Sequence, residues 1–101
     1  MLVNIPFTPD EKQASLEGRK TATSRTKRYG KVGDQFELGG VLFEFLDIRK
    51  MTLSEVAWLF HKAEGFDSYW AFEEERNSQH RRKGWQPEQR VYFHEYRRLE
   101  A

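Results

Sequence analysis

A lysine, a threonine and an arginine stand at close spacing in the segment GRKTATSR, residues 18–25. Lys20 lies three residues before Thr23, and Arg25 lies two residues after it. A neutral lysine amine can take the proton from a hydroxyl nucleophile when burial or neighbouring cations lower its pKa. The basic residues nearby, Arg25 among them, could supply that lowering. The same letters also suit a solvated strand, because threonine favours β-structure.

Such a site would also need a proton donor or an anchoring carboxylate. Glu64 is the candidate, since it stands at the end of the predicted helix 52–65, directly before Gly65. The C-terminus of a helix disfavours a negative charge by roughly a few tenths of a kcal/mol. A carboxylate at this position is therefore expected to have a partner, unless the helix end is simply exposed to solvent.

The last predicted strand carries a second polar stripe, in which Tyr92, His94 and Tyr96 alternate with apolar and acidic residues. Such a stripe can hydrogen-bond to a nucleobase and stack on it, or it can be the polar face of an amphipathic strand. The three histidines of the chain show no metal-ligand spacing and have no cysteine partners, so we expect neither a zinc site nor a cofactor.

Strand geometry restricts how the first motif can work. Side chains alternate along a strand, so Thr21, Thr23 and Arg25 share one face, and Ala22 and Ser24 share the other. A lysine three residues before Thr23 would fall on the opposite face from it. Cooperation between the lysine and Thr23 therefore requires the turn after residue 18, or a bulge, to re-aim the lysine.

The remaining sequence predicts alternating strands and helices. The N-cap Thr8 followed by Pro9 marks one helix start, a capping box of Thr52 and Glu55 marks another, and the pair Gly39–Gly40 marks a hairpin. Strands are predicted at 2–7, 21–25, 35–38, 41–50 and 90–99, and helices at 8–18, 52–65 and 67–77. We therefore expect one α+β domain, residues 1–101, built around a small, mostly antiparallel sheet or barrel with helices packed on it.

Composition narrows the class of protein. The chain has 101 residues, no cysteine and 15% aromatic residues, which predicts a small aromatic core without disulfides or thiolate chemistry. Net charge is only +1, but basic residues cluster in the runs Arg25–Lys31 and His80–Lys83. These runs suit a phosphate-bearing partner such as RNA, or they are ordinary solvated charges. No signal peptide or apolar membrane span is evident, so a cytoplasmic monomer is expected.

Several segments together resemble the ASCH domain family. They are GRKTATSR, YGKVGDQFEL, LSEVAWLFHKAEGFDS and the closing VYFHEYRRL, and the resemblance covers roughly residues 3–99. ASCH domains are similar in fold to PUA-type RNA-binding domains, a small β-barrel with helices packed around it. The resemblance therefore implies a PUA-like barrel for this chain.

The resemblance also implies function. Many ASCH domains are regarded as RNA-binding modules, and some small bacterial members are amidohydrolases that remove the acyl group from N(4)-acetylcytidine. Their motif of a lysine, a threonine three residues on, an arginine two further and a distant glutamate matches Lys20, Thr23, Arg25 and Glu64. The closing-strand tyrosine of those enzymes corresponds to Tyr92, whereas His94 departs from their apolar residue.

On this resemblance the expected activity is hydrolysis of N(4)-acylated cytidines without a metal. Lys20 would take the proton of Thr23, Glu64 would serve the leaving nitrogen, and Arg25 would orient Glu64 or the oxyanion; direct activation of water by Lys20 is the alternative. Substrate contacts are expected from Thr21, Tyr29, Tyr92 and His94. The rival functions are a non-catalytic RNA-binding module and, in third place, a ribonuclease.

Overall fold

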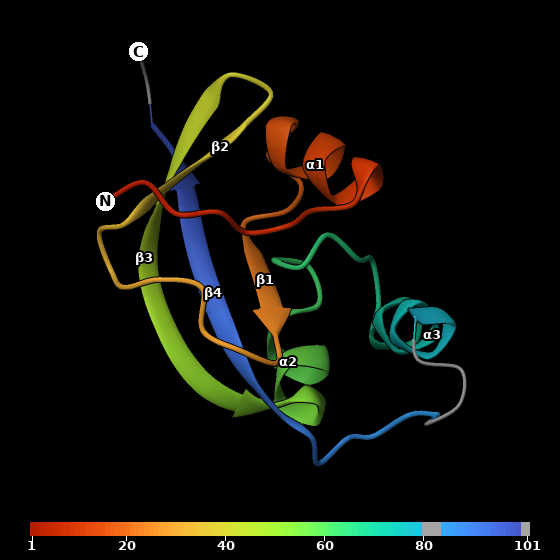
Figure 1. Ribbon diagram of the computed structural model, residues 1–101. Coiled ribbons are helices and arrows are strands. Elements are labelled where there is room, and N and C mark those ends of the chain that lie inside the picture. The colour runs from red at the N-terminus through yellow and green to blue at the C-terminus, as the bar shows by residue number, and fades with distance from the viewer. Residues whose placement is uncertain (80–83, 100–101) are drawn as a thin grey trace.

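A curled antiparallel sheet forms the centre of the molecule, as the computed structural model shows for residues 1–79 and 84–99 (Figure 1). Its order is β1-β4-β3-β2, so the shortest strands form its two edges. The strands are β1 (Ala22–Arg25), β2 (Gln35–Leu38), β3 (Val41–Thr52) and β4 (Arg90–Arg98). The α+β class with a half-barrel, antiparallel sheet is therefore confirmed.

Three helices complete the described part of the chain: α1 (Pro9–Leu16), α2 (Leu53–Phe60) and α3 (Tyr69–Gln79). The capping box predicted at Thr52 is present, and the predicted N-cap Thr8 forms a second box with Glu11. In each box the threonine hydroxyl accepts from the backbone N–H of the glutamate, whose carboxylate accepts from the threonine N–H. In Figure 1, α1 and α3 both lie to the right of the sheet, beyond its edge strand β1. None of the described helices is long and apolar enough to cross a bilayer.

Two of the expected elements differ from the structure. Residues 2–7 form no strand, because within the described part of the chain their backbone pairs with the sheet only at a parallel bridge from Leu2 to Gln35, and Pro6 has no N–H to extend it. The helix predicted over 52–65 ends at Phe60. Residues 61–65 continue as turns, in which the Glu64 N–H donates to the Phe60 carbonyl at 3.0 Å.

The hydrophobic core lies in two parts, one on each face of the sheet. One part packs α2, α3 and the Ala22 side of β1 against Phe93 of β4. The other holds Phe36, Phe43, Phe45 and Tyr96, whose rings contact one another at centroid distances between 5.0 and 5.7 Å. Strand β1 therefore has a buried neighbourhood on both of its faces, which decides where its polar side chains can act.

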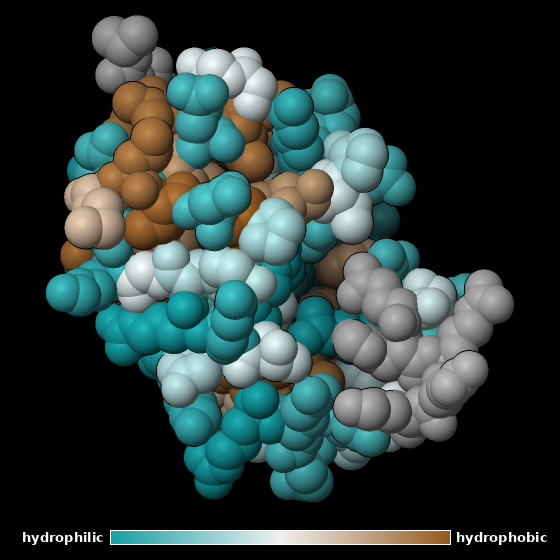
Figure 2. Space-filling view, in the orientation of Figure 1, coloured by the Kyte–Doolittle hydropathy of each residue, from teal (hydrophilic) through white to brown (hydrophobic). Residues whose placement is uncertain are grey.

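Figure 2 shows that hydrophilic residues cover most of the face seen in Figure 1. Hydrophobic residues gather toward the upper left of that view, over the N-terminal segment and the β2–β3 hairpin. The hairpin turns at Gly39 and Gly40, as predicted, and both glycines have positive φ, at 56° and 81°. Such backbone is strained for residues with a Cβ, which explains the glycine pair.

Candidate active site

Lys20 is held between the end of α1 and the turn that follows α2. Its N–H and that of Arg19 both donate to the Ala14 carbonyl, at 3.1 and 2.9 Å. The next two N–H groups, of Thr21 and Ala22, both donate to the Ala63 carbonyl, at 2.7 and 3.0 Å. The backbone therefore fixes Lys20 directly beside the residue that follows Ala63, which is Glu64.

Lys20 and Glu64 form a buried ion pair. Their exposed fractions are 3% and 4%, and the Lys20 Nζ donates at 3.1 Å both to the Glu64 Oε1 and to the Glu64 carbonyl. Gly65 follows directly with a φ of +96°, a backbone conformation that is strained for residues with a Cβ. Glu64 is thus not a solvated helix end, and the expectation that it has a partner is met.

Ser24 supplies the second contact to the carboxylate. Its Oγ donates a hydrogen bond to the Glu64 Oε2, so both carboxylate oxygens are engaged. The bond joins a hydroxyl to a candidate base, and Lys20 in turn orients that base. The sequence places Ser24 on the face of the strand opposite Thr23, and no role was predicted for it.

Thr23 does not join this cluster. Its hydroxyl is completely buried and has no hydrogen-bond partner, so the expected contact with Lys20 is absent. Thr23 is paired across the sheet with His94, whose ring packs on Phe45 in the second part of the core. The reason is strand alternation: Lys20 keeps the parity of Ser24, and no bulge re-aims it toward Thr23.

Arg25 lies at the edge of the cluster. Its Nη2 donates to the Pro6 carbonyl at 2.9 Å and approaches the Glu11 Oε2 at 3.4 Å, and its Nη1 donates to the Ser24 carbonyl at 3.2 Å. The guanidinium also stacks over the Phe7 ring, 5.3 Å from its centroid. Arg25 therefore orients neither Glu64 oxygen, and it serves the neighbouring backbone and Glu11 instead.

Two charged residues that sequence reasoning missed complete the cluster, Glu11 and Arg76. Glu11 has an Oε2 within 3.9 Å of the Lys20 Nζ. Burial alone would raise the pKa of Glu11, but the hydrogen bond from the Thr8 N–H and the charges of Arg25 and Lys20 outweigh burial, so this pKa lies below its ordinary value. Burial lowers the pKa of Arg76, and the negative charge of the Glu64 carboxylate acts in the opposite direction and raises it.

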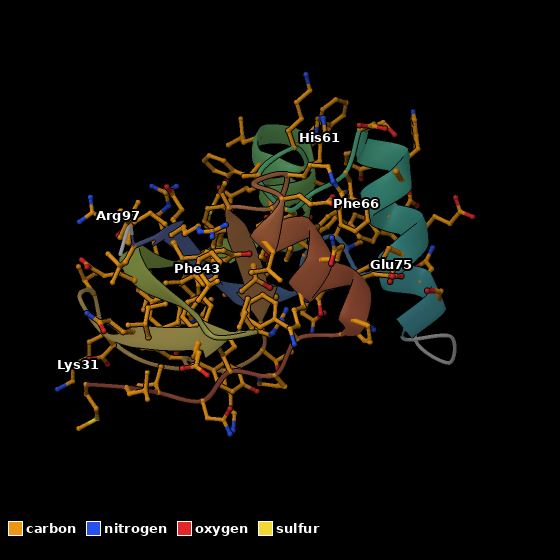
Figure 3. The ribbon with its side chains drawn as sticks, turned by 90° about the horizontal axis from the view of Figure 1, so that it is seen from above. Lys31, Phe43, His61, Phe66, Glu75 and Arg97 are labelled. Atoms are coloured by element: carbon orange, nitrogen blue, oxygen red, sulfur yellow. The ribbon has the colours of Figure 1, made fainter. Side chains whose placement is uncertain are left out.

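A cavity of about 300 Å³ opens beside the ion pair. Its lining includes Lys20, Glu64 and Glu11 together with the apolar Phe66 and Phe72, so charged groups converge at one end of a partly apolar hollow. Figure 3 shows Glu75 reaching from α3 toward α1, where it borders the same cavity. This volume is at the lower end for small-molecule sites, whose usual range is roughly 300–1,000 Å³.

The residues expected to contact a substrate are not brought to this cavity. Thr21 is exposed, and Tyr29, Tyr92 and His94 belong to other surroundings. The His94 Nε2 accepts from the Tyr29 N–H at 3.1 Å, so its Nδ1 carries the proton and donates to the Tyr92 carbonyl at 2.9 Å. Burial lowers the pKa of His94 and keeps the ring neutral, which is a structural role.

Two other predictions concern regions around the site. Lys27, Arg28 and Lys31 of the first basic run are exposed, and the run His80–Lys83 lies outside the described residues. Among residues 1–79 and 84–99, no three His, Asp or Glu side chains gather in a way that could hold a metal ion.

For two of the three residues that the sequence analysis missed, Ser24 and Glu11, the sequence carries a local signal. Lys20, Ala22 and Ser24 share parity, so alternation alone associates the lysine with the serine rather than with Thr23. Glu11 was visible only as an acidic residue in the first turn of the helix predicted at 8–18. Arg76 had no sequence signal, because its place depends on how α3 packs against β1.

Comparison with known proteins supports the fold. No family model and no curated protein matches the chain. A crystal structure of a DUF984-family protein from Enterococcus faecalis superposes with a TM-score of 0.61 and 19% identity, over 87% of this chain. The chain spans 66% of the length of that protein.

A crystal structure of an ASCH domain from Lactobacillus crispatus superposes with a TM-score of 0.63 and 15% identity, over 91% of this chain and 76% of that one. At identities this low the two superpositions establish the fold alone, and the chemistry of the chain has to be argued from its own residues. The chain therefore has the fold of an ASCH domain, which confirms the fold that the sequence resemblance implied.

Proposed function

We propose that the chain is an amidohydrolase that removes the acyl group from N(4)-acetylcytidine and related N(4)-acylated cytidines. The observation that carries this proposal is the buried set Ser24–Glu64–Lys20 at the end of a small cavity. A carboxylate that is fixed by a lysine and a hydroxyl is equipped to move a proton, and an amide needs proton transfer to both the attacking and the leaving group.

In this mechanism Glu64 is the general base and Lys20 is the electrostatic partner. Glu64 takes a proton from a water molecule, whose oxygen attacks the acyl carbon. The Lys20 ammonium stabilises the oxyanion of the tetrahedral intermediate. The bond from the acyl carbon to N4 then breaks, and Glu64 returns its proton to the leaving N4 amine. The products are a carboxylic acid and the cytidine, so no proton or atom is left over.

Water is the proposed nucleophile because neither hydroxyl of β1 is well placed. The Thr23 Oγ1 has no hydrogen-bond partner and therefore no base. Ser24 has a base, but its side chain is only 1% exposed and it does not line the cavity beside Lys20, so a substrate there does not meet its Oγ. Ser24 thus holds Glu64 in place. A covalent acyl-serine is the alternative route, and it leaves an adduct that water attack does not.

The test incubates N(4)-acetylcytidine with the purified wild-type protein or with the Glu64→Gln variant. Chromatography measures how much cytidine each protein forms. Gln keeps the shape of the side chain but accepts no proton, so we expect kcat to fall by about 10²–10⁴-fold. Mass spectrometry of the quenched protein checks for an acyl group on the chain. Absence of turnover by the wild type, or full turnover by Glu64→Gln, would overturn the proposal.

RNA binding is the second candidate, and the exposed cations Lys27, Arg28 and Lys31 on the loop after β1 favour it. Binding through such residues releases counterions and must weaken steeply with added salt, whereas turnover of an uncharged nucleoside should hardly respond. Titration of a fluorescent single-stranded RNA at two salt concentrations separates the candidates. Salt-sensitive binding without any turnover would favour the binding module.

A further inference from the structure

A second cavity adjoins the first. It measures about 480 Å³ and shares Thr8, Glu11 and Arg76 with the cavity beside Lys20. Ser24, Arg25 and Thr26 line only the second cavity. The shared lining makes the two cavities adjoining sections of one cleft, and we refer to the second section as the arginine section.

Ser24 stands between the two sections. Its hydroxyl faces Glu64 in the first section, whereas its carbonyl accepts from the Arg25 Nη1 at 3.2 Å and from the Arg76 Nη1 at 3.4 Å. The two guanidinium groups therefore converge on a single neutral oxygen. A ligand that extends past Ser24 from the acidic end would arrive directly at this pair of cations.

The positive charge of the arginine section is not balanced by its own residues. Glu11 is the one carboxylate among its lining residues, and it is already divided between Arg25 at 3.4 Å and the Lys20 Nζ at 3.9 Å. Arg76 has a buried Nε with no hydrogen-bond partner. A cation with an unused donor, beside a second cation, is an arrangement that an anionic ligand would complete.

The chemistry of the anion follows from the donors. Guanidinium groups present planar pairs of N–H donors that match the oxygens of phosphate, and two such groups can hold several phosphate oxygens at once. Thr26, exposed at the same section, adds a hydroxyl donor. A phosphate bound here would stand across Ser24 from Glu64, as expected for a substrate that carries its amide and its phosphate at different ends.

We propose that Arg25 and Arg76 form a phosphate subsite, so that the preferred substrate is a phosphorylated N(4)-acylcytidine rather than the free nucleoside. The identity of the acylated base rests on the function proposed above; the subsite itself rests only on the arginine section. A 5′-monophosphate and a phosphodiester of single-stranded RNA present the same chemistry, and the experiment separates these two sources.

The first measurement is kcat/KM for N(4)-acetylcytidine, for its 5′-monophosphate and for a short RNA that contains the same nucleotide. For the wild type we expect the monophosphate or the RNA to exceed the nucleoside by about 10- to 100-fold, the range that one charge-assisted hydrogen bond supplies. In Arg76→Gln this ratio should fall toward one. Arg97→Gln is the matched control, because it removes one exposed arginine outside the cleft and should keep the ratio.

The second measurement does not require turnover. Isothermal titration compares cytidine 5′-monophosphate with cytidine, and inorganic phosphate is the minimal probe. Tighter binding of the phosphorylated ligand by the wild type and by Arg97→Gln, lost in Arg76→Gln, supports the subsite even if neither substrate is hydrolysed, in which case only the proposed function fails. Equal binding of cytidine and its monophosphate, with a kcat/KM ratio near one, would overturn the subsite while leaving the amidohydrolase intact.

Discussion

The two faces of β1 place neighbouring hydroxyl groups, those of Thr23 and Ser24, in different surroundings. Thr23 and Ser24 are both buried, with exposed fractions of 0% and 1%. The Thr23 hydroxyl has no partner and lies on the aromatic face, the side of the sheet that holds Phe36, Phe43 and Phe45. The Ser24 hydroxyl lies on the other side, the charged face, where it bonds the Glu64 carboxylate that Lys20 also contacts. Burial alone therefore does not identify a functional hydroxyl, because what decides its role is the group across from it.

The faces differ in their energetics as well. On the aromatic face, removal of Phe36, Phe43, Phe45 and similar rings from water stabilises the folded state. The charged face buries an ion pair whose desolvation offsets much of its attraction, so the pair is a poor device for stability. A buried pair that borders a cavity is better explained by chemistry, which is why the proposed function rests on that face.

The largest effect should come from Lys20→Met. Removing the ammonium leaves the buried Glu64 carboxylate without its cation, and we expect the free energy of unfolding to fall by about 3–5 kcal/mol. Urea denaturation measures it. The double variant Lys20→Met/Glu64→Gln should recover part of the loss, because no buried charge is then uncompensated. A loss below about 1 kcal/mol in the single variant would mean that the pair is hydrated.

Ser24→Ala should have the next largest effect. It removes a hydrogen bond to a charged group, and such bonds contribute about 1.5–3 kcal/mol. We expect a loss of this size in urea denaturation, together with a lower kcat for the acylated cytidine, because Glu64 loses one of the groups that fix its orientation. Unchanged stability would show that water replaces the Ser24 hydroxyl, and the charged face would then be less dry than the structure indicates.

His94 makes the aromatic face sensitive to pH. Because burial holds its folded pKa below the ordinary 6.5, the unfolded chain takes up a proton first as the pH falls. Its contribution to stability is complete above pH 6.5 and is lost below it, with a slope of at most about 1.4 kcal/mol per pH unit. Urea denaturation between pH 7.5 and 5.5 should show a flatter profile for His94→Gln than for the wild type.

His61→Gln is the control for that comparison, since it removes an imidazole that lies outside the aromatic face. If His94→Gln keeps the wild-type pH profile, then protonated His94 is accommodated in the fold. The contrast between a neutral aromatic face and a charged cleft would be weaker in that case.

Thr23→Val should have the smallest effect. Valine has nearly the shape of threonine and lacks the hydroxyl that has no partner, so we expect stability to change by less than about 1 kcal/mol, with stabilisation the expected sign. Hydrolysis of the acylated cytidine should be retained. A large loss of activity with normal stability would return Thr23 to the role that the sequence motif suggested.

The sequence predicted the parts of the fold that depend on local signals. The N-cap Thr8, the capping box at Thr52, the glycine pair of the hairpin and the alternation of the closing strand each correspond to an element in the structure. The strand expected at 2–7 failed because apolar composition does not show whether a neighbouring strand is available to pair with. That information belongs to the arrangement of the whole sheet.

The candidate site was predictable in the same measure. The family resemblance placed Lys20 and Glu64 in one site, but their ion pair was not predicted, and the hydroxyl beside them was assigned to Thr23 against the parity of the strand. The role of Arg76 could not be predicted from the sequence, because its side chain reaches the Ser24 carbonyl only when the whole helix α3 packs against β1 at one particular angle.

The carbonyl of Ala63 accepts from two successive N–H groups at the start of β1, those of Thr21 and Ala22. The turn that carries Glu64 is thereby tied to an edge of the sheet, so it cannot move away without releasing both amides. Hydrogen–deuterium exchange at these two positions therefore reports on the integrity of the cleft in the absence of any ligand. Slow and matched exchange would describe a preformed site, and fast exchange would describe one that is assembled when its substrate binds.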